Sequence, residues 1–127
     1  MNTMTRKQEI LVLFLILVLA GFLRLWQLDT IPPGLYPDVA INGNDALNAL
    51  QNRDFKVFYP EHNGREGLFF HLIALSFAIF GPSVWAIKIV AALIGFLTVL
   101  GTYLLVKEIF STNKYLPLIS SFLLATS

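Results

Sequence analysis

The sequence predicts an all-α membrane protein, with several transmembrane helices and amphipathic helices lying on the membrane surface in the first outer loop. Composition is the first reason, because 56% of the 127 residues are apolar and 13% are charged. Soluble domains carry about a quarter charged residues. Two long apolar runs, and a polar stretch between them that is rich in proline and glycine, are the other reasons.

The first apolar run predicts a transmembrane helix over residues 10–26. Its uncharged part, "ILVLFLILVLAGFL", follows Arg6 and Lys7, and a spanning helix needs about 20 apolar residues. Arg24 can extend its charged head to the surface, and Trp26 suits the membrane interface. A cleaved signal peptide is the alternative. Because "LAGFLRLW" lacks a small-x-small cleavage site, an uncleaved anchor with a cytoplasmic N-terminus is favoured.

Residues 27–83 then form an extracytoplasmic loop. Its first part, "TIPPGLYP", cannot be regular helix because each proline restricts the residue before it. Asp38 is a good N-cap residue, and helical spacing groups the residues after it into two faces. The predicted helix is therefore amphipathic and is expected to lie along the membrane surface. Its apolar face carries Val39, Gly43, Ala46, Leu47 and Leu50, and another face carries Asp38, Asn42 and Asp45.

A second spanning helix is predicted over residues 84–106. The preceding apolar segment, 68–80, would be about 20 Å long as a helix, against about 30 Å of hydrocarbon. We therefore expect it not to cross, which leaves "KEIFSTNK" in the cytoplasm. If 68–80 did cross, this basic segment would lie outside. Residues 115–127 start a further transmembrane helix, so we expect the chain to be the N-terminal part of a larger protein.

The outer loop carries residues suited to chemistry at the membrane surface. Asp38 is the candidate general base, and Asp45 lies two turns further on the same helix face. Arg65 and Glu66 precede the next apolar segment, and Arg24 ends the first helix. Such cations could hold a lipid phosphate. The alternatives are that Asp38 caps a helix and that the arginines anchor the chain at the interface.

Several of these motifs together resemble a known family. The ordered series "PPGLYPD", "NGREGLF" and "FGPS", followed by a long apolar helix, is similar to the N-terminal part of bacterial C-type glycosyltransferases. These enzymes are related to protein O-mannosyltransferases and to the aminoarabinose transferases of lipid A. The resemblance covers roughly residues 20–127 and implies an enzyme with about a dozen helices that transfers a sugar from a polyprenyl phosphate with inversion.

By position, the resemblance assigns the catalytic carboxylate to Asp38 and the charged pair of the family to Arg65 and Glu66. Many members have Asp-Glu where this chain has Asp38 and Val39. If that glutamate helps to bind an acceptor or an ion, Asp45 or Glu66 must take its role here.

The expected partners follow from the same resemblance. They are a lipid-linked sugar donor, an acceptor that is a glycan, lipid or protein, and the plasma membrane, with the active site outside the cytoplasm. A net charge of +1 predicts no nucleic-acid binding. No cofactor is expected, and His62 and His71 lack zinc-ligand spacing, although divalent metal dependence stays open. The rival class is a non-catalytic membrane protein, such as a transporter or assembly subunit.

The predicted topology can be tested by cysteine labelling, because the chain has no cysteine of its own. Single cysteines are placed at Asn63 and Ser111 and exposed to an impermeant thiol reagent in intact cells. We expect labelling at position 63 and none at position 111. Labelling at position 111 would mean that residues 68–80 cross the membrane.

Overall fold

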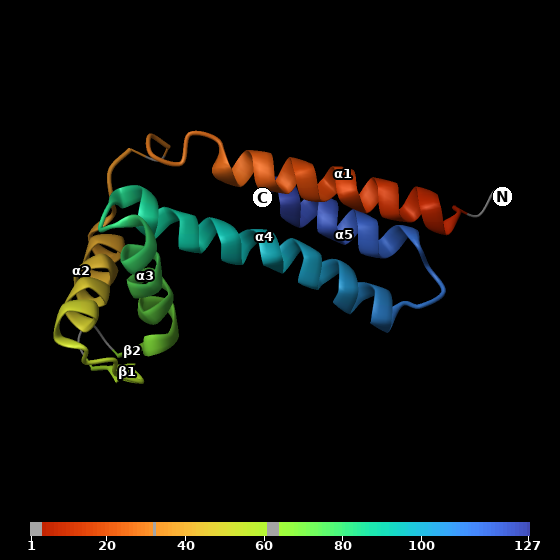
Figure 1. Ribbon diagram of the computed structural model, residues 1–127. Coiled ribbons are helices and arrows are strands. Elements are labelled where there is room, and N and C mark those ends of the chain that lie inside the picture. The colour runs from red at the N-terminus through yellow and green to blue at the C-terminus, as the bar shows by residue number, and fades with distance from the viewer. Residues whose placement is uncertain (1–3, 32, 61–63) are drawn as a thin grey trace. The chain divides into compact units, whose positions relative to one another are not determined.

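The computed structural model describes residues 4–31, 33–60 and 64–127. The described chain is mostly helical, as predicted, and two of its helices, α1 and α4, are long and apolar enough to cross a membrane. His62 and Asn63, considered above, lie outside the described residues. Figure 1 shows the elements: α1 (Arg6–Leu25), α2 (Pro37–Asn52), β1 (Phe58–Tyr59), β2 (Arg65–Glu66), α3 (Gly67–Phe80), α4 (Val84–Ile109) and α5 (Tyr115–Thr126).

The chain forms two compact units. The terminal unit consists of the residues up to Trp26 together with Ala92–Ser127, and so holds α1, most of α4, and α5. The middle unit consists of Gln27–Ala91 and holds α2, the two strands, α3 and the first turns of α4. Each unit has a hydrophobic cluster of its own.

α1 begins earlier than the apolar run because its N-terminus is capped. The Thr5 hydroxyl accepts a hydrogen bond from the Gln8 backbone N–H (3.3 Å), and the Gln8 side chain accepts one from the Thr5 N–H (2.9 Å). This reciprocal capping box satisfies two backbone donors that a helix start leaves without partners. The helix therefore starts at Arg6, one turn before Ile10.

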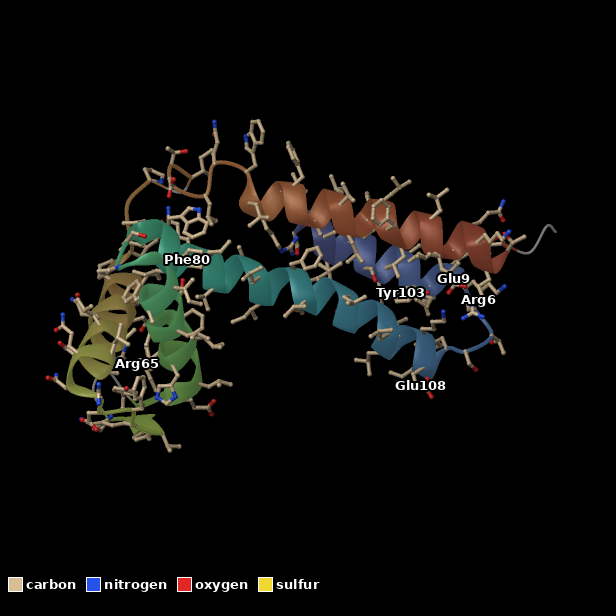
Figure 2. All side chains as sticks on the ribbon, viewed as in Figure 1. Arg6, Glu9, Arg65, Phe80, Tyr103 and Glu108 are labelled. Carbon is tan, nitrogen blue, oxygen red and sulfur yellow. The ribbon has the colours of Figure 1, made fainter. Side chains whose placement is uncertain are left out.

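The terminal unit packs α1 against α5 along small and aliphatic residues, and the two helices lie side by side in Figure 1. Glu9 on α1 is buried, with 3% of its surface exposed. Its carboxylate accepts hydrogen bonds from the Tyr103 hydroxyl (2.6 Å) and the Lys107 ammonium (2.8 Å), both on α4. Figure 2 labels Glu9 and Tyr103 near the N-terminal end of α1. A buried carboxylate needs such partners, because an isolated one would be strongly destabilising.

In the middle unit, α2 packs on α3 through the apolar face that helical spacing predicted. Gly43 and Ala46 are buried, and the larger residues of this face pack against a hydrophobic cluster that includes Phe70, Ile73 and Phe77 of α3. α3 packs against this face within the middle unit, and the position of α2 along the membrane surface stays a prediction. α3 can pack there because its residues are apolar on nearly every side. This packing fixes which side of α2 is left for polar chemistry.

Candidate functional site

Asp38 lies in the first turn of α2, and its side chain is exposed. The sequence suggested that Asp38 itself was the N-cap, but the N-cap is Tyr36, and Pro37 is the first helical residue. Proline fits that position because its fixed φ suits a helix start. The backbone N–H that proline lacks would have no hydrogen-bond partner within the helix there. Among the described residues, no side chain caps α2. The carboxylate is therefore near the positive end of the helix without being used as a cap.

Arg65 is held against the polar face of α2. Its Nη2 donates to the Asp45 Oδ2 (2.6 Å) and its Nη1 donates to the Asn42 Oδ1 (2.7 Å). The Asp45 and Arg65 side chains are 14% and 19% exposed, so water screens this pair less than a surface pair. We call the side chains of Arg65, Asp45 and Asn42 the arginine clamp. It joins β2 to α2 across twenty residues of chain.

The surroundings of Arg65 explain its fixed position. Its guanidinium carbon lies 4.9 Å from the centre of the Phe70 ring, within the range of a cation–π contact. Figure 2 labels Arg65 in the region of α2 and α3. Two of its five N–H groups serve the clamp, and its Nε is buried with no partner among the described residues. The two Nη hydrogens outside the clamp therefore remain for a further anion, whereas the buried Nε is out of its reach.

The short strand pair, which was not predicted, presents Arg65 to α2. β1 and β2 are antiparallel, with Tyr59 opposite Arg65. Directly after β2, the Gly67 N–H donates to the Val57 carbonyl (2.8 Å). A Cβ on Gly67 would collide with the Lys56 carbonyl oxygen, so only glycine permits this approach. The start of α3 is thereby tied to the segment just before β1.

The other two candidate residues lie in different surroundings. Glu66 is exposed and is the N-cap of α3, although its side chain makes no capping hydrogen bond within the described structure. Arg24 belongs to the terminal unit. It was expected to reach the membrane surface, but its guanidinium donates to the carbonyls of Leu124 (2.9 Å) and Ala125 (2.9 Å) at the end of α5. Gly95 of α4 leaves the room that this side chain occupies.

The clamp contains contacts that sequence analysis missed. Asn42 was placed on the same helix face as Asp38 and Asp45, and that spacing was the signal for a shared partner. Nothing in the sequence indicated that Arg65 is this partner, or that Phe70 lies against the guanidinium.

Residues 68–127, a little less than half of the chain, match the model of the dolichyl-phosphate-mannose-protein mannosyltransferase family. The match covers α3, α4 and α5 and stops short of Asp38, Asp45, Arg65 and Glu66. No curated protein and no solved structure matched the chain.

A mostly helical chain with two helices able to cross a membrane fits the class of membrane glycosyltransferases. The family match confirms the resemblance to the protein O-mannosyltransferase superfamily that the motifs indicated, and it indicates a glycosyltransferase-like membrane protein.

The arginine clamp predicts measurable coupling between Asp45 and Arg65. In a double-mutant cycle of Asp45→Ala and Arg65→Ala, we expect a coupling of about 1–3 kcal/mol in the free energy of unfolding. Each single variant leaves a partly buried charge without its partner, so the two losses should not add. Denaturant unfolding of the purified protein in detergent gives all four values.

The matched control is Asp54 with Lys56, an ion pair at 3.2 Å whose side chains are 61% and 54% exposed. Its coupling should stay below about 1 kcal/mol. Equal coupling in both cycles would contradict a special role for the arginine clamp.

Proposed function

We propose that this protein transfers a sugar from a polyprenyl-phosphate donor to an acceptor hydroxyl at the extracytoplasmic face of the membrane, with Asp38 as the general base. The observation that carries the proposal is an exposed carboxylate in the first turn of α2 that has no capping role. A structural acid would be expected to hydrogen-bond to the backbone there. This carboxylate is available to a substrate instead.

The chemistry follows from one displacement. The acceptor oxygen forms a bond to the anomeric carbon while the bond from that carbon to the phosphate oxygen breaks, and attack from the opposite side inverts the configuration. The acceptor proton passes to Asp38, and the electron pair of the broken bond leaves with the lipid phosphate. A positioned base contributes about 10²–10⁴ in rate. A cation beside the departing phosphate stabilises the developing charge.

Arg65 is the proposed cation. Its guanidinium is already fixed by Asn42 and Asp45, so binding a phosphate with its remaining donors requires little further ordering. In this scheme Asp45 orients Arg65, and the exposed Glu66 is placed to contact the acceptor. Arg24 is the weaker phosphate candidate, because its guanidinium is already bound to two α5 carbonyls.

The base assignment is tested by Asp38→Asn in the full-length protein. We expect transfer from a lipid-phosphate donor to fall by about 10² or more, because an amide cannot take the proton. Asn suits a helix start nearly as well as Asp, so expression and membrane insertion should stay normal. Turnover with a polyprenyl-phosphate sugar is the measurement.

Asp45→Asn is the matched comparison. Its position lies about 10 Å further along the same helix, and an amide oxygen can still accept from Arg65. It should therefore lose much less activity than Asp38→Asn. Near-parent turnover of Asp38→Asn would refute the assignment, and a larger loss from Asp45→Asn would move the base to Asp45.

The phosphate assignment is tested by Arg65→Lys. A lysine offers a single charged point in place of a planar fork of donors, so the Kd for the donor should rise about tenfold to a hundredfold. Titration of the purified protein with a polyprenyl-phosphate sugar gives the Kd. Arg53→Lys, at the exposed end of α2, is the control and should bind as the parent does. An unchanged Kd for Arg65→Lys would leave Arg65 with the clamp as its role.

A further inference from the structure

A depression of about 320 Å³ lies beside the C-terminal half of α2 in the middle unit, and the proposed reaction does not use it. One alanine contributes to its wall, and every other lining residue is polar: Asp45, Asn48, Asn52, Asp54, Lys56 and Tyr59. Its volume falls at the small end of the range for ligand sites, about 300–1,000 Å³. Most such sites are lined mainly by apolar side chains. This one therefore suits a small ligand with polar groups around its edge.

The charges around the depression are balanced, which favours an uncharged ligand. Asp54 pairs with Lys56 at 3.2 Å, and Asp45 pairs with Arg65 at 2.6 Å. Arg65 does not line the depression, and Lys56, the one cation in its wall, is paired with Asp54, so an anion has no unpaired cation to bind inside it. Among the described residues, no three acidic, histidine or cysteine side chains are grouped so that they could hold a metal ion, whereas calcium takes six to eight oxygen ligands.

Tyr59 supplies a second observation that points to a ligand. This side chain lines the depression and is 7% exposed. Its hydroxyl is buried and has no hydrogen-bond partner among the described residues. A buried polar group without a partner costs about 1–3 kcal/mol, so a ligand hydroxyl that reached it would be bound favourably. Asn48 and Asn52 each offer both donors and an acceptor, which is the combination that hydroxyl groups need.

The depression lies on the face of α2 that bears the proposed base. Asp38, Asp45 and Asn52 are seven residues apart, and a seven-residue step on a helix returns to nearly the same face. Asp45 and Asn52 are about 10 and 20 Å along the helix axis from Asp38. A general base must come within about 3 Å of the proton that it takes. A ligand in the depression is therefore not the group that reacts.

We propose that this depression binds one sugar ring through its hydroxyls, as a subsite for a part of the acceptor glycan remote from the reacting hydroxyl. The inference rests on the proposed function for its place in the reaction, but binding of the ring itself does not depend on Asp38. A donor carrying more than one sugar would present the same chemistry. The experiment therefore includes an arm for each source.

The probes are the methyl glycosides of mannose, glucose and galactose, added to the full-length protein in detergent and followed by saturation-transfer NMR. We expect at least one glycoside to bind, and Tyr59→Phe to weaken its binding by about tenfold through loss of one hydrogen bond. Tyr36→Phe removes the same atom from a side chain that is 74% exposed and lies outside the depression. That control should bind as the parent does.

A second pair of variants guards against a folding defect in Tyr59→Phe. Asn48→Ala should also weaken glycoside binding, whereas Asn44→Ala, on α2 but outside this depression, should not. Failure of all three glycosides to bind the parent would overturn the proposal. So would parent-like binding by both Tyr59→Phe and Asn48→Ala, or loss of glycoside binding on addition of calcium chloride or inorganic phosphate.

Two further arms separate this proposal from the proposed function. Asp38→Asn should keep glycoside binding while losing turnover, and full turnover in that variant would refute the base and leave the subsite standing. A polyprenyl-phosphate sugar added with the glycoside should leave glycoside affinity unchanged. Competition between the two would overturn the acceptor assignment and give the ring to the donor.

Discussion

The contact of Arg65 with Asp45 and Asn42 is the constraint on which the candidate site depends. Its two hydrogen bonds, 2.6 and 2.7 Å long, join the strand before α3 to the polar face of α2. Phe70 lies against the same guanidinium. Because β2, α2 and α3 meet at the Arg65 side chain, the loop between the two candidate membrane spans has a defined polar face. A flexible loop could carry the same residues but could not hold a carboxylate and a cation in fixed positions.

α2 serves two purposes because its faces are chemically different. Gly43 leaves room for the Ile87 side chain of α4, and Ala46 is buried in the cluster that α2 shares with α3; this packing accounts for the apolar half of the helix. The opposite half keeps Asp38, Asp45 and Asn52 together. A catalytic group at one end and a hydroxyl-binding depression further along would give the helix control over both proton transfer and substrate choice. Rigid elements position such groups better than loops do.

Helical content, the two apolar spans and the two faces of α2 could be predicted, because each depends on residues close together in the sequence. The start of α2 was assigned to Asp38 because Asp is a frequent N-cap, but Pro37 already suits the first turn. The strand pair escaped prediction since each strand has two residues, too few to show an alternating pattern. The capping box at Thr5 and Gln8 was not predicted, although Thr followed three residues later by Gln is its sequence pattern.

The sequence by itself determined the class of protein, since apolar runs long enough to cross a bilayer are a property of consecutive residues. It also determined which candidate groups share a helix face, through the 3.6-residue repeat. The tertiary structure decided which of the candidate side chains are in contact. Arg65 and Asp45 are twenty residues apart, and no local periodicity links positions on a strand and a helix. Their contact depends on α2 packing against α3 and on Gly67 allowing the chain to pass close to Lys56.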